Sequence, residues 1–188
     1  MAISVKNNVF TLQTKNSTYQ MKADERRVLL HTYYGAKTDE TDHSYLIQMA
    51  DHGFSGNIAG TEDERVYSLD YLPQEFPVLG SGDHRIHCLA ADLGSGVCDC
   101  LLLFDSYKVY DGKYSIPGLP AMFAGESAQT LEILLKDCRE EFYVRLLYGV
   151  FEDVDIITRS VVIENRMEGP AVLKKVSSAC VDLMENGL

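Results

Sequence analysis

The chain has 188 residues, of which 46% are hydrophobic and 24% are charged, so it can form one globular domain with a buried core and is not a disordered tail. We expect a single domain over residues 1–188. The 28 Asp and Glu residues against 17 Lys and Arg give a formal net charge of -11. Because this charge would repel a phosphate backbone and an anionic bilayer, we expect neither a nucleic-acid partner nor a membrane partner.

Two further features concern the cellular compartment. No apolar run approaches the roughly 20 residues that span a bilayer, and residues 1–8 lack the charged and then apolar layout of a signal peptide. The cysteines are odd in number and contain no Cys-x-x-Cys pair, which favours reduced thiols over a disulfide framework. We therefore expect a cytoplasmic protein with five free thiols, at Cys88, Cys98, Cys100, Cys138 and Cys180.

The first half of the chain contains short stretches rich in β-branched and aromatic residues, separated by turn residues. Such spacing, about 8 to 15 residues here, is typical of β-sandwiches and barrels. Residues 9–12 and 18–21 form the first predicted hairpin. Further strands are predicted over 85–91 and 97–104, the second ending in a turn at Asp105-Ser106, whose side chains can bond the backbone.

The last third of the chain carries the clearest strands. Apolar and aromatic side chains alternate from Phe142 to Tyr148, and residues 155–165 are nearly all β-formers. With residues 171–176 after a turn, these segments predict three antiparallel strands in meander order. Residues 131–138 fit both a helical spacing and a strand alternation, and we interpret them as a strand. The fold class is therefore all-β, an antiparallel β-sandwich.

The segment from residue 38 to residue 83 differs from the rest because it is polar and rich in glycine, with two prolines near its end. A segment of this length without clear strands is usually functional in a compact domain. It contains three distinctive strings, ADHGFSGN over 50–57, YSLDYLPQEFP over 67–77 and GSGDHR over 80–85.

These strings resemble the amino-terminal domain of glycoside hydrolase family 36 α-galactosidases, also called melibiases. The order Leu-Asp, Pro-Gln-Glu, Phe-Pro and Gly-Asp between Ser68 and Arg85 is the specific part of the resemblance. Weaker agreement continues at 33–35, 110–113, 118–121, 130–133 and 155–160, so that the resemblance covers almost the whole chain.

The resemblance implies a galactose mutarotase-like supersandwich that precedes a catalytic (β/α)8 barrel and a carboxy-terminal β-domain. Both of these would lie beyond Leu188. The two carboxylates of a retaining glycosidase stand about 5 to 5.5 Å apart, and in this family they lie on the barrel. The chain alone should therefore be inactive, with no catalytic residue, metal or cofactor of its own. The full-length enzyme would be an intracellular homotetramer that removes terminal galactose from melibiose and raffinose-type oligosaccharides.

One residue of this chain is implied to touch the substrate. Asp51 matches the family's aspartate near a Gly-Phe-Ser string, which contacts a sugar hydroxyl in the galactose subsite. An ionised carboxylate can accept two hydrogen bonds from neighbouring hydroxyls. The sequence departs from the family pattern just after this residue, because His52 follows it and residues 56–59 contain no proline. Without the resemblance, an Asp in such a Gly-rich loop would be interpreted as a turn-former.

Two other functions remain open, a stand-alone carbohydrate-binding module and a structural interaction domain. The chain contains 11 tyrosines, which can stack on sugars, but no tryptophan, which sugar-binding platforms favour. The carboxylates at 62–64 have no EF-hand spacing and are interpreted as a solvated loop face. Galactose titration of the chain would distinguish a binding module from the other two functions.

Overall fold

The computed structural model describes residues 2–51, 58, 61, 64–120 and 128–181. Within these residues the regular structure consists of ten β-strands and one short 3-10 helix, η1 (His43–Leu46). Neighbouring strands pair antiparallel in three sheets. The all-β prediction is confirmed. No helix in the described residues has the length and apolar character that crossing a bilayer requires.

The first sheet contains four strands in chain order, β1 (Ile3–Lys6), β2 (Val9–Gln13), β3 (Ser17–Ala23) and β4 (Leu29–Ala36). Asn7 and Asn8 join β1 to β2 with φ angles of 50° and 60°. Positive φ at both central residues is the signature of the tight turn whose twist matches a hairpin, and asparagine tolerates it. The predicted hairpin between β2 and β3 is confirmed by their pairing.

The second sheet contains β6 (Leu102–Asp111), β7 (Ala128–Asp137), β8 (Phe142–Phe151) and β9 (Ile156–Asn165), again in chain order. Residues 131–138, whose pattern fitted helix and strand, form most of β7, so the strand interpretation is confirmed. Pairing on both sides explains this outcome, because β7 lies between β6 and β8 and most of its alternate side chains are buried.

Two predicted strands have the wrong bounds. The strand predicted over 97–104 begins only at Leu102, and the turn predicted at Asp105-Ser106 does not form, because β6 continues through it with a bulge between Phe104 and Ser106. A bulge bends a strand while pairing resumes beyond it, which lets turn-forming residues lie inside a strand. The strand predicted over 85–91 is shorter and shifted, and forms β5 (Leu89–Asp92).

The predicted meander of the last three strands is also wrong. Strand β9 pairs with β8, but β10 (Val172–Val176) leaves that sheet and pairs with β5. Ser177 N–H extends this contact by donating to Cys88 O at 2.8 Å. The alternation of side chains along a strand defines the two faces of the strand but not the strand with which it pairs. The partner of β10 is β5, which lies about 80 residues earlier in the chain.

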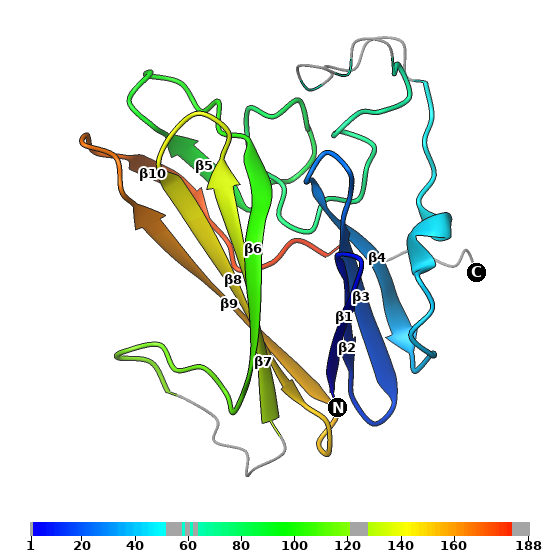
Figure 1. The fold of residues 1–188 in the computed structure, drawn as a ribbon. Helices are drawn as coiled ribbons and strands as arrows, with labels where there is room; N and C mark the ends of the chain where they lie inside the picture. Colours follow the sequence, from blue (N-terminus) through cyan, green and yellow to red (C-terminus); the bar gives the residue numbers. More distant parts are fainter. Residues whose placement is uncertain (1, 52–57, 59–60, 62–63, 121–127, 182–188) are drawn as a thin grey trace.

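The two four-stranded sheets lie face to face, with β6–β9 on the left and β1–β4 on the right in Figure 1. Their facing side chains form one buried cluster, which includes Phe10, Leu12 and Met21 from one sheet and Ile133 and Leu146 from the other. This arrangement is the predicted β-sandwich. The segment between β4 and β5, coloured cyan to green, runs over one end of the sandwich (Figure 1).

Candidate functional site

Asp51, the predicted substrate contact, lies on the surface in the segment between β4 and β5. Its side chain is 45% exposed, and its Oδ2 lies 3.3 Å from Arg65 Nε. Arg65 Nη2 also donates to Asp51 Oδ1 at 3.4 Å. Two contacts from one guanidinium orient the carboxylate plane. Residues 52–57, which contain the rest of the predicted loop, lie outside the described residues. Within the described residues, the structure shows Asp51 as a partly exposed carboxylate paired with Arg65.

Backbone hydrogen bonds anchor the residues that precede and follow Arg65. Thr61 N–H donates to Ile58 O, Glu64 N–H to Thr61 O, and Tyr67 N–H to Glu64 O. The Tyr67 hydroxyl then donates to Asp24 Oδ2 at 2.6 Å. Burial and this hydrogen bond raise the pKa of Tyr67 above its usual range, so the hydroxyl remains a donor. Arg65 thus stands between two anchored neighbours while its own side chain is 67% exposed.

A second hydrophobic cluster holds this segment against the end of the first sheet. Its five buried members are Val28, Leu30, Tyr67, Leu69 and Leu72. The first two belong to the region of β4 and the other three to the YSLDYL string, so this part of the family signature packs against the sandwich. The segment that carries Asp51 is therefore supported by a packed base.

The GSGDHR string closes the same segment. Asp83 is 2% exposed and accepts from Arg85 Nε at 3.0 Å and from Gln74 Nε2 at 2.8 Å. Arg85 Nη2 also donates to the carbonyls of Leu69 and Leu72. Burial by itself would raise the pKa of Asp83, but the hydrogen bonds and charge of Arg85 hold it below its usual value. This carboxylate is a structural acceptor.

Glu75, inside the PQEFP string, occupies the centre of a buried polar cluster between the two sheets. Its Oε1 accepts from the hydroxyls of Tyr19 and Tyr148, each at 2.7 Å, and lies 2.7 Å from Arg159 Nη1. Its Oε2 lies 3.3 Å from His31 Nδ1. We call these five residues the Glu75 cluster. They come from β3, β4, β8, β9 and the long segment, so one carboxylate links both sheets.

The ionisation states within the Glu75 cluster follow from its contacts. Burial would raise the pKa of Glu75, but the charge of Arg159 and the contact with His31 hold it below its usual value. Burial, with the charge of Glu75 added, raises the pKa of Tyr19 and of Tyr148 well above their usual range. Glu75 is therefore an ionised acceptor and both tyrosines remain donors, an arrangement suited to structure rather than to proton transfer.

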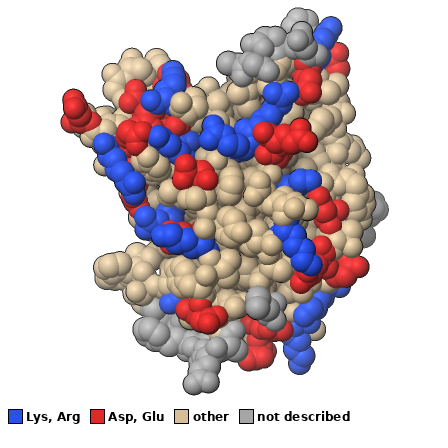
Figure 2. Space-filling view, in the orientation of Figure 1, with Lys and Arg blue, Asp and Glu red and all other residues tan. Residues whose placement is uncertain are grey.

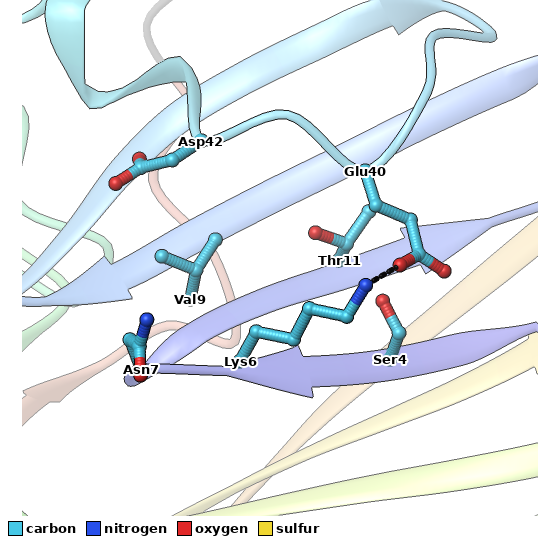
Figure 3. A pocket seen from close by; sticks show the side chains of 7 residues that line it. All are labelled: Ser4, Lys6, Asn7, Val9, Thr11, Glu40 and Asp42. Atoms are coloured by element: carbon cyan, nitrogen blue, oxygen red, sulfur yellow. Dashed lines mark hydrogen bonds and ion pairs between the residues drawn. The ribbon is translucent and has the colours of Figure 1, made fainter.

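A hollow of about 220 Å³ lies beside β1 and β2 (Figure 3). It is lined by Ser4, Lys6, Asn7, Val9, Thr11, Glu40 and Asp42. Figure 3 shows the ammonium of Lys6 reaching Glu40 across the hollow. Asp42 is similarly paired with Lys22 at 2.7 Å. The three charged side chains that line this hollow are therefore all paired, Lys6 with Glu40 and Asp42 with Lys22.

Charged side chains of both signs are interspersed over the face seen in Figure 2. Many charged side chains of the described residues are paired. Arg145 Nε, for example, lies 3.2 Å from Glu132 Oε1, and Arg139 Nη2 lies 2.8 Å from Asp99 Oδ2. The net negative charge of the chain is therefore not gathered into one acidic area on this face. In the described residues, no three His, Cys, Asp or Glu side chains gather as metal ligands would.

The assignment of Asp51 to the substrate stays a prediction from the sequence, which indicated neither the contact of Asp51 with Arg65 nor the buried position of Glu75. Arg65 lies 14 residues beyond Asp51, and no spacing rule connects two residues of an irregular segment. Glu75 had a weak signal, because a glutamate between buried apolar residues requires partners to offset its burial. His84 is exposed and His87 is half-exposed.

Comparison with known proteins places this geometry in a family. The family model of the glycosyl hydrolase family 36 N-terminal domain matches residues 27–188. The chain is 48% identical over 178 residues to the bifunctional alpha-galactosidase/sucrose kinase AgaSK of Mediterraneibacter gnavus, covering 94% of this chain and 19% of that protein. It is 32% identical over 181 residues to alpha-galactosidase Mel36A of Lactobacillus acidophilus, covering 95% of this chain and 25% of that protein.

Solved structures agree with these sequence relatives. The galactosidase domain of AgaSK superimposes with a TM-score of 0.92 at 47% identity, over 96% of this chain and 25% of that one. The alpha-galactosidase AgaB of Geobacillus stearothermophilus gives a TM-score of 0.85 at 31% identity, over 95% of this chain and 24% of that one. The chain thus spans about a fifth to a quarter of the relatives it matches. It belongs to the glycosyl hydrolase family 36 N-terminal domain family.

Proposed function

We propose that this chain is the amino-terminal part of an intracellular α-galactosidase that hydrolyses terminal α-galactosides such as melibiose and raffinose-type oligosaccharides. The observation that carries the proposal is the family match over residues 27–188 together with relatives that are alpha-galactosidases. In this proposal the chain supplies a scaffold and one edge of the sugar site, and the catalytic carboxylates lie on a barrel elsewhere in the longer protein.

The buried carboxylates of the described residues support this division of labour. Glu75, Asp83 and Asp137 are each at most 2% exposed, and all three accept hydrogen bonds from neighbouring groups. Asp137, for example, accepts from the backbone N–H groups of Leu101, Arg139 and Glu140. A retaining glycosidase instead needs two carboxyl groups about 5 to 5.5 Å apart around a sugar. The three buried carboxylates are engaged in holding the fold.

Within the longer enzyme, we assign Asp51 to the galactose subsite. Its exposed carboxylate, oriented by Arg65, can accept hydrogen bonds from two sugar hydroxyls. Backbone hydrogen bonds of Glu64 and Tyr67, and the burial of Tyr67 in the second hydrophobic cluster, anchor the neighbours of Arg65. The chain would therefore contribute binding energy and specificity to the reaction without transferring a proton.

Two features support an assembled, intracellular protein. Strand β10 exposes Val172, Leu173 and Val176 by 54%, 45% and 47%, an apolar area suited to contact with the barrel or with a neighbouring subunit of a homotetramer. All five cysteines are free, and burial raises the pKa of Cys88 to about 12, which keeps that thiol protonated and unreactive. Light scattering on the longer protein would measure the subunit number.

The experiment that tests the proposal compares the 188-residue chain with the longer protein encoded by the same reading frame. We expect the longer protein to release nitrophenol from nitrophenyl α-galactoside and the chain alone to release none. Activity of the chain alone that survives Asp51→Ala would contradict the proposal. So would a longer protein that lacks a barrel or that hydrolyses no α-galactoside.

A further inference from the structure

The buried core is less complete at β9 than at its neighbour β8. Strand β9 forms one edge of its sheet, at the left in Figure 1. Val144 and Leu146 of β8 are both 0% exposed and belong to the main buried cluster. Their direct partners on β9, Ile163 and Val161, are only partly buried. Because residues directly opposite each other in an antiparallel pair lie on the same face, the core ends part of the way across β9.

The two-stranded sheet of β5 and β10 shows the same loss of burial. Leu89 and Ala91 of β5 are both 0% exposed. Val176 and Leu173, which lie opposite them on β10, are 47% and 45% exposed. Aliphatic side chains that are half open beside fully buried partners are usually covered by a further part of the protein. The core therefore stops short at both of these strands.

The backbone of β9 also has a free edge. Within the described residues, β9 pairs with β8 alone, over all 10 residues of Ile156–Asn165. An edge strand presents N–H and C=O groups to which another strand can pair, and proteins usually protect such an edge with charges, proline or a bulge. The stretch Ser160–Ile163 has none of these, whereas β10 carries Lys174 and Lys175. Strand β9 is therefore a suitable template for one more strand.

We propose that a β-strand of the longer polypeptide, from beyond residue 188, pairs with the free edge of β9 and extends the core over Val161 and Ile163. This inference rests on the proposed function, because that function supplies the longer polypeptide. In this arrangement the β-sandwich continues past residue 188 before the barrel begins, and the added strand brings apolar side chains on the face that it turns toward the core.

Two observations favour this occupant over a second copy of the chain. Each copy carries a formal net charge of -11, so two copies would repel each other. The relatives also have residues to supply such a strand, because this chain covers only 19% to 25% of their lengths. A strand of the same polypeptide is already held near β9, so its pairing loses less translational freedom than the association of two molecules.

The first test is hydrogen–deuterium exchange on the longer protein encoded by the same reading frame. A strand paired on one side leaves roughly every other backbone N–H open to water, whereas a strand paired on both sides protects nearly all of them. We expect the amides of β9 to be protected as strongly as those of β8, which has a strand on each side. Fast exchange of about half of the β9 amides would overturn the proposal. Protection that is lost on dilution would also overturn it, because a second copy would then cover this edge.

A photo-cross-linking group on β9 identifies the occupant. Benzoylphenylalanine replaces Val162, a half-buried residue of β9, in an equal mixture of isotopically heavy and light longer protein. We expect cross-links within one polypeptide, to the residues that follow Leu188 and precede the barrel. The same group in place of Tyr45, which is 71% exposed on η1, is the control and should not reach that segment. Thermal unfolding checks that both substituted proteins are folded.

Three results of the cross-linking would overturn the proposal: cross-links from position 162 to the barrel, cross-links between heavy and light chains, or none to the segment after Leu188. Release of nitrophenol from nitrophenyl α-galactoside, measured on the same preparation, separates this inference from the proposed function. Hydrolysis by a protein whose β9 edge is open would overturn the added strand alone. A protected β9 in a protein that hydrolyses no α-galactoside would contradict the proposed function alone.

Discussion

Glu75→Gln is the substitution that most directly tests the buried link between the sheets. It keeps the size of the side chain and an oxygen acceptor for the hydroxyls of Tyr19 and Tyr148, but it removes the negative charge that Arg159 faces at 2.7 Å. The guanidinium, 11% exposed, then lies buried without its counterion. We expect a loss of about 3 to 5 kcal/mol in the free energy of unfolding, because removing one partner of a buried ion pair leaves an uncompensated charge.

The same loss should depend on pH. The pKa of Glu75 is lower in the folded chain than its ordinary value, so its ionisation adds stability above the pKa of the unfolded chain, about 4.3. That contribution is lost as the pH falls through the lower, folded value. The difference between the natural chain and Glu75→Gln should therefore be full at neutral pH and shrink progressively below about pH 4.

The assay is urea unfolding followed by far-ultraviolet circular dichroism at several pH values. A domain with about 5 to 15 kcal/mol of stability should remain folded enough in the variant for the loss to be measured. Glu64→Gln is the matched control, because its carboxylate is 54% exposed and pairs with Arg26 at the surface, where screening makes ion pairs weak. The double variant Glu75→Gln/Arg159→Met should recover part of the loss. A Glu75→Gln loss below about 1 kcal/mol, or one that is independent of pH, would refute the reasoning.

Other expectations concern the sugar subsite and the backbone. In the longer enzyme, Asp51→Ala should lower kcat/KM about 10- to 150-fold at an unchanged Tm, with Asp51→Asn less affected, and unchanged kinetics would make this residue a turn-former. Arg65→Gln should lower kcat/KM by a smaller factor, because it loosens the carboxylate without removing it. Gly80→Ala should destabilise the chain by about 3 kcal/mol or more, because φ is +99° and a Cβ would lie 2.1 Å from Cys98 O. Gly96→Ala, with φ of +84° and open space around it, should cost only about 1 to 2 kcal/mol by urea unfolding.

The sequence pattern predicted strands correctly where it fitted a strand and no other element. Alternation from Phe142 to Tyr148 and the β-formers of 155–165 gave β8 and β9 in the predicted order. The same reasoning failed at Asp105-Ser106, because turn-forming side chains do not prevent a bulged strand when the partner strand β7 supplies hydrogen bonds on either side. It also failed for β10, whose partner β5 lies far away in the chain.

For the candidate site, too, the sequence indicated which strings matter but not which contacts their residues make. The prediction for Asp51 rests on the family string around it. The YSLDYLPQEFP and GSGDHR strings could likewise be recognised without knowing what their residues contact. The structure shows that Glu75 and Asp83 in those strings are buried acceptors. Arg85, the partner of Asp83, lies 2 residues from it in the sequence. Arg159, the partner of Glu75, lies 84 residues from it. No pattern within a string distinguishes a buried acceptor from a carboxylate that contacts substrate.

The sequence by itself determined the all-β class, the first predicted hairpin, the strand identity of β8 and β9 and the family. These depend on side-chain periodicity, turn residues and short strings, which are local properties. Only the tertiary structure decided that β7 is a strand paired on both sides, that β10 joins β5, that Arg65 contacts Asp51, and that Glu75 links both sheets. Each of these is a contact between segments that are separated along the chain, and such contacts are set by how the buried faces of the two sheets meet.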